Sequence, residues 1–354
     1  MSLMVIVMSP DATADDVDAV VAAVESAGGE ASVGRLSVAG GSGRTFIGVT
    51  GDLALIDALR IDEMRGVGRV RRVSTSYKLV SREHRTERST VEVGGVTIGP
   101  GTFTLIAGPC AVESAAQTTE AAQIARSAGA TMLRGGAFKP RTSPYAFQGL
   151  GEAGLKILAD VRDRTGLPVV TEVLSVRDVE LVASYADMLQ IGTRSMQNFP
   201  LLQAVGAAGR PVLLKRGMMN TIEEWLMAAE YIARAGTLDI VLCERGIRTF
   251  EPATRNTLDI AAVPLAQHLS HLPVIVDPSH SGGRRDLVAP LSRAAVAAGA
   301  DGVIIDVHPR PEQARCDGGQ ALTGPELLPL ARQLDDLTTV LGRTTAAPRY
   351  RLAG

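Results

Sequence analysis

Residues 102–134, TFTLIAGPCAVESAAQTTEAAQIARSAGATMLR, decide the fold of this chain. An apolar run at Thr104–Ala107 is followed by a stretch with helical spacing at Ala115–Ala128, and then by a second apolar run at Met132–Leu133. Short runs rich in Val, Ile and Leu predict buried strands, and the helical spacing between them predicts a crossover helix. One such unit indicates α/β architecture with parallel strands.

The same unit recurs as far as residue 305. Six further apolar runs follow, at Pro168–Val170, Met188–Ile191, Val212–Leu214, Ile240–Leu242, Val274–Val276 and Val303–Ile305. Stretches with helical spacing separate them, such as Gly151–Arg164, Thr221–Ala235 and Asp286–Ala298. Eight strand–helix units over roughly 240 residues predict a (β/α)₈ TIM barrel, which we place at 102–342. The alternative is a doubly wound open sheet, but Gly108-Pro-Cys110 is not the glycine-rich dinucleotide turn typical of that fold.

The chain before the barrel falls into two parts. Residues 1–75 read as strand, helix, strand, strand, short helix and strand, the βαββαβ order of a ferredoxin-like domain. No cluster of catalytic residue types occurs there, so we expect a packing or ligand-sensing unit with a regulatory role. Residues 76–101 hold a polar linker and a predicted hairpin, Val91–Ile98 around Gly94-Gly95, that could close the barrel bottom. We expect the tail, 343–354, to be disordered.

Composition excludes several classes of protein. The chain has 354 residues, and 36 Lys and Arg against 38 Asp and Glu give a net charge of -2, so nucleic acid and anionic membranes are not expected partners. No apolar run approaches the roughly 18 residues of a spanning helix, and the start lacks a signal peptide, so we expect a cytoplasmic protein. Three cysteines, Cys110, Cys243 and Cys316, are too few and too widely spaced for a disulfide framework.

Cationic side chains follow successive strands of the predicted barrel, where the active site of such a fold forms. The cations are Arg134, Lys139, Arg141, Arg194, Lys215 and Arg245. Each alone could be a solvated loop charge, but six at one barrel end in a slightly acidic chain predict a local anion site. Guanidinium groups match phosphate and carboxylate bidentately, so two phosphates, or a phosphate and a carboxylate, are the expected ligands.

A second set of residue types suits a divalent metal. Cys110, His280, Asp306 and Asp317 supply a thiolate, an imidazole and two carboxylates, which suit Mn²⁺, Fe²⁺, Co²⁺ or Zn²⁺. Their spacing, over roughly 200 residues, forms no sequence motif, so a buried cysteine in the core remains the alternative for Cys110. We assign Cys243 and Cys316 to the core.

Six segments at these strand ends resemble one enzyme family. They are Ala107-Gly-Pro-Cys-Ala-Val-Glu-Ser114, Leu133-Arg-Gly-Gly-Ala-Phe-Lys-Pro-Arg-Thr-Ser-Pro-Tyr145, Gln190-Ile-Gly-Thr-Arg194, Leu214-Lys-Arg-Gly217, Cys243-Glu-Arg-Gly-Ile-Arg-Thr249 and Asp277-Pro-Ser-His-Ser-Gly-Gly-Arg-Arg285. The segments are similar to those of the 3-deoxy-D-arabino-heptulosonate 7-phosphate (DAHP) synthases, in particular the short-chain type I-beta subfamily with an N-terminal ferredoxin-like regulatory domain. The alternative is 3-deoxy-manno-octulosonate 8-phosphate (KDO8P) synthase, which uses arabinose 5-phosphate. Lys139-Pro-Arg-Thr142 favours the DAHP enzymes, since the rival family typically has Ala-Asn in place of the proline.

The resemblance implies condensation of phosphoenolpyruvate with erythrose 4-phosphate and water, which releases phosphate and begins aromatic amino-acid synthesis by the shikimate pathway. It implies that phosphoenolpyruvate is bound by Arg134, Lys139, Arg194, Lys215 and Arg245, beside Glu172. Pro140, Arg141 and Thr142 would take the sugar phosphate, and the catalytic set would be Lys139, Cys110, His280 and Glu172. Either Glu172 or a metal-bound water would handle the proton.

The resemblance also places a divalent metal on Cys110, His280, Asp306 and Asp317. Asp306 departs from the family pattern, because the third ligand is usually Glu, and the shorter side chain puts direct ligation in doubt. The same resemblance implies feedback by an aromatic amino acid at the N-terminal domain, and a homo-oligomer, expected to be a tetramer, to transmit it.

Overall fold

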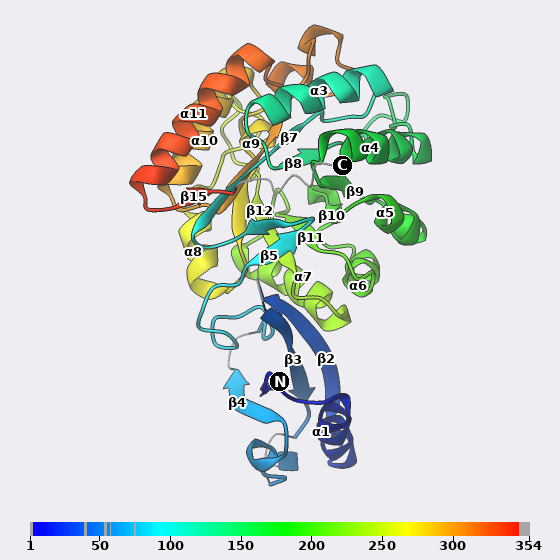
Figure 1. Cartoon of the computed structure of the whole chain (residues 1–354), viewed down its shortest axis with the longest axis vertical. Coiled ribbons are helices and arrows are strands. Elements are labelled where there is room, and N and C mark those ends of the chain that lie inside the picture. Colours follow the sequence, from blue (N-terminus) through cyan, green and yellow to red (C-terminus); the bar gives the residue numbers. More distant parts are fainter. Residues whose placement is uncertain (1–2, 39–40, 53–54, 57, 74–75, 347–354) are drawn as a thin grey trace.

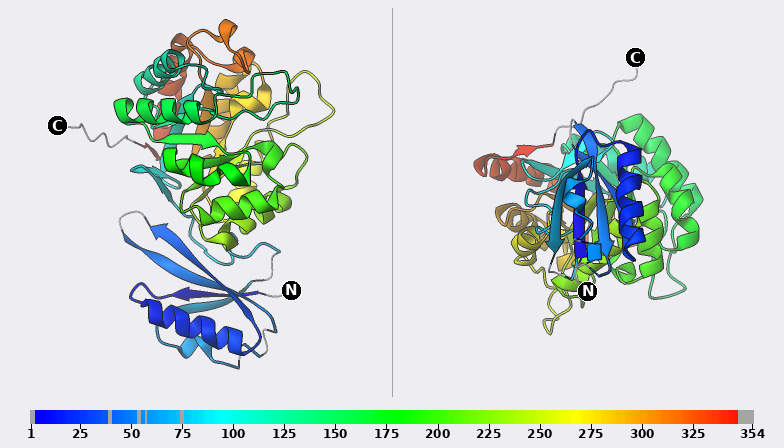
Figure 2. Two further views of the ribbon diagram at one scale, coloured as in Figure 1. Left: turned by 90° about the vertical axis from the view of Figure 1, so that its right-hand side faces the viewer. Right: turned by 90° about the horizontal axis from the view of Figure 1, so that it is seen from below.

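The computed structural model describes residues 3–38, 41–52, 55–56, 58–73 and 76–346. They form a barrel and a smaller domain, which we call the head, joined by one linker (Figure 1). The left view of Figure 2 shows the head below the barrel, and strand β2 of the head contacts helix α7 of the barrel, whose bounds follow below. This division follows the two patterns of hydrophobic residues in the sequence.

Eight parallel strands form the closed barrel. Each strand pairs in parallel with the next along the chain, and β14 pairs with β7, from Gly302 against Thr104 to Asp306 against Gly108. The strands are β7 (Thr102–Gly108), β8 (Met132–Arg134), β9 (Val169–Glu172), β10 (Met188–Ile191), β11 (Val212–Lys215), β12 (Ile240–Glu244), β13 (Val274–Val276) and β14 (Gly302–Asp306). The predicted (β/α)₈ barrel is therefore confirmed.

Helices cover the outside of the barrel (Figure 1). They are α3 (Ala115–Ser127), α4 (Glu152–Thr165), α5 (Val179–Tyr185), α6 (Phe199–Ala207), α7 (Ile222–Ala235), α8 (Ala262–Leu269), α9 (Pro278–Gly282), α10 (Arg285–Ala297) and α11 (Gly324–Val340), with 3₁₀ turns at Val176–Asp178, Thr193–Ser195, Pro311–Gln313 and Gly318–Gln320. Helix α7 shows why the sequence folds in this way. A capping box of Thr221 and Glu224 starts it, and its buried face includes Trp225 and Ile232.

A hairpin closes the end of the barrel at which the strands begin. Strands β5 (Val91–Val93) and β6 (Val96–Ile98) pair around Gly94 and Gly95, whose φ angles of 56° and 86° suit a tight two-residue turn. Val91, Val93, Val96 and Ile98 pack in one buried cluster with inward-facing barrel side chains such as Ile106 and Leu213. Only the opposite end, at the carboxyl ends of the strands, is left to hold a ligand.

The head has the ferredoxin-like order predicted from the sequence. Its elements are β1 (Leu3–Met8), α1 (Ala14–Ser26), β2 (Glu30–Val38), β3 (Gly41–Thr50), a 3₁₀ turn (Ile61–Glu63) and β4 (Val67–Val73), and the sheet order is β2-β3-β1-β4. Ile6, Val20 and Ile47 are fully buried in its core. The short helix expected at Leu53–Leu59 includes residues 53, 54 and 57, which lie outside the described residues.

Buried polar groups fix the linker to the barrel. The Glu230 carboxylate on α7 accepts hydrogen bonds from the backbone N–H groups of Leu79 (2.9 Å) and Val80 (3.1 Å). His271, just before β13, lies with Nε2 2.8 Å from the Leu79 carbonyl and Nδ1 2.6 Å from the Ser89 hydroxyl. Because a carbonyl only accepts, Nε2 carries the proton and Nδ1 accepts from Ser89. Burial lowers the pKa of His271 to about 3, so the ring is neutral.

The C-terminal segment begins with regular structure, although we expected disorder from residue 343 onward. Thr344–Thr345 form β15, which pairs in parallel with the beginning of β7. Arg343 is held by the carbonyls of Ala300 (2.7 Å) and Thr102 (2.6 Å) and by Asp301 (2.8 Å). Backbone pairing and a buried ion pair therefore order residues 343–346, while residues 347–354 lie outside the described part of the chain. No helix within the described ranges is long and apolar enough to cross a membrane.

Candidate active site

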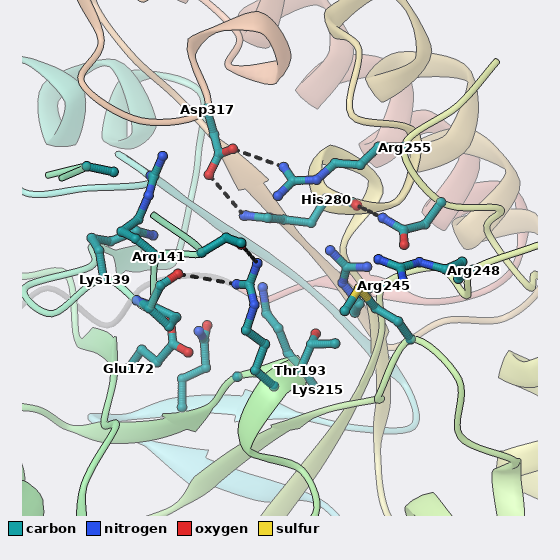
Figure 3. A pocket seen from close by; sticks show the side chains of 18 of the residues that line it. Lys139, Arg141, Glu172, Thr193, Lys215, Arg245, Arg248, Arg255, His280 and Asp317 are labelled. Atoms are coloured by element: carbon teal, nitrogen blue, oxygen red, sulfur yellow. Dashed lines mark hydrogen bonds and ion pairs between the residues drawn. The ribbon is translucent and has the colours of Figure 1, made fainter. Parts of the chain in front are cut away.

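The carboxyl ends of the strands surround a cavity of about 410 Å³, which we call the mouth cavity. All six cations singled out in the sequence line it, together with Glu172, His280 and Asp317 (Figure 3). Pro140 and Thr142 also line it, whereas Cys110 and Asp306 are buried and do not. Every lining residue of the mouth cavity belongs to the barrel. The net charge of -2 makes this cluster of cations a local feature of the strand ends.

Four of the six cations are buried, namely Arg134, Lys139, Lys215 and Arg245, and the first three have anionic partners. Arg134 at the end of β8 donates to Asp306 (2.6 Å), and Lys215 at the end of β11 pairs with Asp277. Lys139 Nζ donates to the Cys110 carbonyl (2.9 Å) and lies 3.2 Å from the Cys110 sulfur. Burial opposes the charge on Lys139, but the Cys110 thiolate overrides it and raises the pKa of the ammonium. The cationic wall is therefore rigid before any ligand arrives.

The loop after β8 carries Pro140, Arg141 and Thr142, the residues predicted to bind the sugar phosphate. Arg194 donates to the Pro140 carbonyl (3.3 Å) and to the Thr142 hydroxyl (3.4 Å), so it braces the segment Lys139–Thr142 from the end of β10, two strands away from β8. Arg141 NH1 lies 2.6 Å from the Cys316 sulfur. Arg194 and Thr142 are exposed, in contrast to the buried Lys139. This side of the cavity can therefore adjust to a ligand more easily than the side formed by Arg134, Lys139 and Lys215.

Glu172 is the buried carboxyl of the cavity floor. Burial raises the pKa of Glu172, while Lys139 and Lys215 oppose the rise. Gly192, just after β10, leaves room for the Glu172 carboxyl. A Cβ at position 192 would lie 1.8 Å from Glu172 Oε1. A raised pKa makes this carboxyl a candidate for proton transfer at the site.

A thiolate, an imidazole and a carboxylate meet at one edge of the cavity. The ligand atoms of Cys110, His280 and Asp317 all lie within 4.8 Å of one another, with 3.7 Å from Cys110 Sγ to His280 Nε2 and 3.2 Å from Cys110 Sγ to Asp317 Oδ2. A hydrogen bond from Cys316 and the charge of Lys139 hold the pKa of Cys110 well below its usual range. The pKa of His280 is raised to about 9: burial would lower it, but Asp277 and Asp306 outweigh that. These donor types fit a divalent transition metal.

Asp306 lies apart from this set of three, although the sequence placed it among the ligands. Its Oδ1 accepts from Arg134 (2.6 Å), and its Oδ2 accepts from the side-chain amide of Gln320 (2.6 Å). The distance from its Oδ2 to His280 Nε2 is 3.6 Å. Because both carboxylate oxygens already have partners, Asp306 serves as the counter-ion of Arg134. Within the described residues the close group is thus Cys110, His280 and Asp317, and ligation by Asp306 stays a prediction.

Sequence reasoning missed four side chains of this site, which are Arg248, Arg255, Cys316 and Gln320. Arg255 donates to Asp317 Oδ1 (2.9 Å) and to the Gln320 side-chain oxygen (3.0 Å). Cys316 is 5% exposed, as expected for a core residue, but its sulfur lies 3.9 Å from that of Cys110. Its position next to Asp317 was the available signal. Cys243, in contrast, is fully buried on β12 in the barrel interior, as expected.

Comparison with known proteins gives a consistent result along the whole chain. Residues 79–343 match the DAHP synthetase I family, and residues 4–75 match the DAHP synthase ferredoxin-like domain. A phospho-2-dehydro-3-deoxyheptonate aldolase of Thermotoga maritima is 51% identical over 339 residues, which cover 96% of this chain and 99% of that protein. The crystal structure of a phospho-2-dehydro-3-deoxyheptonate aldolase (DAHP synthase) from T. maritima shares 50% identity, covers 98% of this chain and 100% of its own, and has a TM-score of 0.76.

Less similar relatives are named 2-dehydro-3-deoxyphosphooctonate aldolases, which corresponds to the KDO8P alternative. A 2-dehydro-3-deoxyphosphooctonate aldolase of Syntrophobacter fumaroxidans is 34% identical over 274 residues, which cover 72% of this chain and 94% of that protein. Both the identity and the coverage are lower than for the T. maritima protein, so the comparisons favour the heptonate branch over the octonate branch.

Proposed function

This chain belongs to the DAHP synthetase I family and is a DAHP synthase, and from that premise we propose that the mouth cavity is its active site. The reaction joins phosphoenolpyruvate, erythrose 4-phosphate and water to give DAHP and phosphate. The observation that carries the proposal is the gathering of six cations from four strand ends on one cavity of an acidic chain. Two phosphorylated substrates repel each other, and such a wall lowers the cost of holding both at once.

We assign the rigid side of the cavity to phosphoenolpyruvate. Arg134, Lys139 and Lys215 are buried, and with Arg245 and Arg194 they can hold one carboxylate and one phosphate in a fixed orientation. Arg141 and Thr142, on the more exposed side, are assigned to the phosphate of erythrose 4-phosphate. Pro140 fixes its own φ and restrains Lys139, which keeps the residues for the two substrates in register.

The chemistry follows from these positions. The C3 carbon of phosphoenolpyruvate forms a bond to the aldehyde carbon of erythrose 4-phosphate, water adds at C2, and phosphate leaves from C2. The aldehyde oxygen gains a proton and the attacking water loses one. Glu172 is the residue we assign to that proton, because burial raises its pKa and it lies among the phosphoenolpyruvate cations.

Cys110, His280 and Asp317 would hold a divalent metal ion, because a thiolate, an imidazole and a carboxylate converge there. Bound there, the metal would supply Lewis acidity that polarises the aldehyde. Cys110 has to stay reduced for this role, so we expect the enzyme to work in a reducing compartment such as the cytoplasm; the described cysteines are all free.

We further propose that the head binds an aromatic amino acid that feeds back on the barrel, and that the enzyme assembles as a tetramer. The head matches the ferredoxin-like domain of the family, but none of its described residues lines the mouth cavity. A signal from the head therefore has to pass through the linker or through a neighbouring copy. Light scattering of the purified chain, with and without tyrosine or phenylalanine, tests the assembly.

The test of the activity is phosphate release from phosphoenolpyruvate with erythrose 4-phosphate or arabinose 5-phosphate, by chelated and by metal-repleted protein. We expect turnover with the four-carbon sugar only, lost on chelation and restored by Mn²⁺. Turnover with arabinose 5-phosphate would contradict the substrate assignment. Turnover that survives complete removal of metal would remove the ligand role from Cys110, His280 and Asp317.

A further inference from the structure

Two loops at the carboxyl end of the barrel are joined by an aromatic ring and a guanidinium group. We call them the β8 loop, residues 135–151, and the β14 loop, residues 307–323. The β8 loop carries the residues assigned to the sugar phosphate, and the β14 loop carries Asp317. The guanidinium carbon of Arg315, in the β14 loop, lies 3.7 Å from the centre of the Phe147 ring, in the β8 loop. This distance is well within the range of a cation–π contact.

The other contacts of Phe147 are apolar. The side chain is half-buried and packs against a small buried cluster of Cys110, Ala111 and Cys316. Cys110 and Ala111 follow β7, and Cys316 belongs to the β14 loop, so segments that follow three different strands meet at Phe147. Phe147 is not among the residues that line the mouth cavity. Any effect of Phe147 on a ligand is therefore exerted through the loop to which it belongs.

Phe147 lies next to the backbone contacts that close the base of the β8 loop. The N–H group of Lys139 donates to the Gln148 carbonyl (2.9 Å), and the residues that flank this pair form an antiparallel bridge. Arg141 and Thr142 lie on the limb that leaves this base, and Phe147 lies on the limb that returns to it. Because the two limbs are joined at the base, a contact that fixes Phe147 restricts the movement of Arg141 and Thr142.

The β14 loop is itself fixed at Arg315. The backbone N–H group of Arg315 donates to Glu113 Oε1 (2.8 Å), which comes from the segment after β7. Arg141 NH1 lies 2.6 Å from the Cys316 sulfur, so a second contact joins the same two loops. Asp317, two residues after Arg315, has a φ of 54°, a left-handed conformation that the surrounding contacts have to maintain. Phe147 therefore packs against a loop whose position is already set.

We propose that Phe147 and Arg315 are positioning residues that form a clasp, and that the clasp holds the β8 loop ready for the phosphate of erythrose 4-phosphate. The inference rests on the proposed assignment of Arg141 and Thr142 to that phosphate. A loop that is ordered for only part of the time binds its ligand with an apparent affinity reduced by that fraction. The clasp raises the ordered fraction before the sugar phosphate arrives. Phosphoenolpyruvate is assigned to the rigid side of the cavity, so its binding does not depend on the clasp.

Steady-state kinetics of the full chain, with each substrate varied in turn, test the clasp. Phe147→Leu keeps an apolar side chain without an aromatic face, and Arg315→Met keeps the length of the side chain without its charge. We expect each to raise the KM for erythrose 4-phosphate about two- to fivefold, the effect of one cation–π contact at an exposed site. The kcat and the KM for phosphoenolpyruvate should stay unchanged. The double variant should show the same rise as either single variant, because all three lack the same interaction.

Two further variants serve as controls. Phe147→Tyr retains the aromatic face and should keep the wild-type KM for erythrose 4-phosphate. Tyr145→Leu removes an aromatic ring from the same loop, but Tyr145 is 97% exposed, so this variant should behave as the wild type.

Hydrogen exchange followed by mass spectrometry gives a readout that does not depend on turnover. The amide of Lys139 is protected by its bond to the Gln148 carbonyl, so its exchange reports opening of the base of the β8 loop. We expect exchange in residues 139–149 to be faster in Phe147→Leu than in the wild type or in Tyr145→Leu. Erythrose 4-phosphate should reduce the difference, because the bound phosphate orders the same loop.

The other outcomes overturn the inference in ways that can be told apart. An equal rise in the KM for both substrates, or a fall in kcat alone, would show a general structural role for the two side chains. Additive effects in the double variant would show that Phe147 and Arg315 act separately. If the KM for erythrose 4-phosphate rises in Thr142→Val but not in the clasp variants, the clasp is wrong and the site assignment stands. If Thr142→Val also leaves this KM unchanged, the proposed sugar-phosphate site itself is wrong. Circular dichroism of every variant confirms that folded proteins are compared.

Discussion

At the scale of single residues, Lys139 shows how a buried charge is stabilised and then used. The residue is 7% exposed, and its ammonium lies against the Cys110 carbonyl and sulfur, between the other cations of the cavity and the proposed metal ligands. A group in that position can bind substrate phosphate or carboxylate and can also keep Cys110 ionised.

Replacing Lys139 with Met should abolish turnover while the fold stays intact. The methionine has a similar length but no charge, so we expect kcat/KM to fall by about 1,000-fold, as for loss of a buried charge-stabilising donor. Steady-state kinetics with phosphoenolpyruvate measure the effect. Lys156→Met is the matched control, because Lys156 on α4 is exposed and pairs only with Glu152. A well-folded Lys139→Met enzyme with normal turnover would refute the assigned role.

Glu172→Gln tests the proton assignment at the same scale. The amide keeps the size of the side chain but carries no transferable proton, so we expect kcat to fall by about 10²–10⁴-fold. The KM for phosphoenolpyruvate should change little, because the cations remain. Gly192→Ala, which pushes on Glu172 Oε1, should lower kcat in the same direction. A variant that loses only affinity, with kcat unchanged, would make Glu172 a binding residue instead.

At the scale of elements, the junction between linker and barrel depends on a neutral histidine. His271 has a pKa of about 3 in the folded chain against 6.5 for an unperturbed imidazole, with burial as the main cause. Below pH 6.5 the unfolded chain binds a proton on this residue that the folded chain refuses, so stability is present above 6.5 and falls as the pH decreases toward 3. Well inside that window, the loss approaches about 1.4 kcal/mol per pH unit.

We therefore expect His271→Gln to flatten the acid side of the stability profile. The glutamine amide can still donate to the Leu79 carbonyl but does not titrate. Urea unfolding of both proteins between pH 7.5 and 5 measures the free energy of unfolding. The difference between wild type and variant should shrink or reverse as the pH falls. Parallel profiles for the two proteins would show that this histidine does not carry the pH dependence.

The helices and strands of the barrel could be predicted from the sequence better than the contacts between distant loops. All eight barrel strands could be predicted, because strands buried on both faces are continuous apolar runs such as Val212–Leu214. The position of Cys316 beside Cys110 could not, because it depends on how two loops about 200 residues apart meet over the barrel. The order at Thr344–Thr345 was missed for a similar reason, since pairing with β7 leaves no pattern in so short a segment.

Part of the candidate site could also be predicted from the sequence. The (β/α)₈ pattern placed Arg134, Lys139 and Lys215 at one end of the barrel, because Arg134 and Lys215 end strands and Lys139 lies in the loop that follows β8. It gave no information on Arg255 or Gln320, although Arg255 binds both Asp317, a proposed metal ligand, and Gln320. Nor could it show that Asp306 is engaged by Arg134, since a counter-ion and a metal ligand are the same residue type in sequence.

At the scale of the whole molecule, the head and the mouth cavity are separate structures. The cavity is lined by residues between Arg134 and Asp317, and strand β2 of the head contacts the barrel at α7 and at β5. Val5 and Phe46 of the head share a buried cluster with Tyr77, Leu79 and Val80 of the linker. The head therefore adds apolar packing at the barrel flank, and none of its described residues lines the mouth cavity.

Removing residues 1–76 should separate these two contributions. The remaining barrel should keep kcat/KM within about threefold of the full chain, because a domain with its own core retains its active site. Its melting temperature should fall, since Leu79 and Val80 lose apolar contacts with the head. The crystal structure of a truncated T. maritima synthase that covers 76% of this chain supports folding of such a fragment. Tyrosine or phenylalanine should inhibit the full chain and leave the shortened one unaffected. Inhibition of both would place the effector on the barrel, and loss of activity on truncation would show that the head supports catalysis directly.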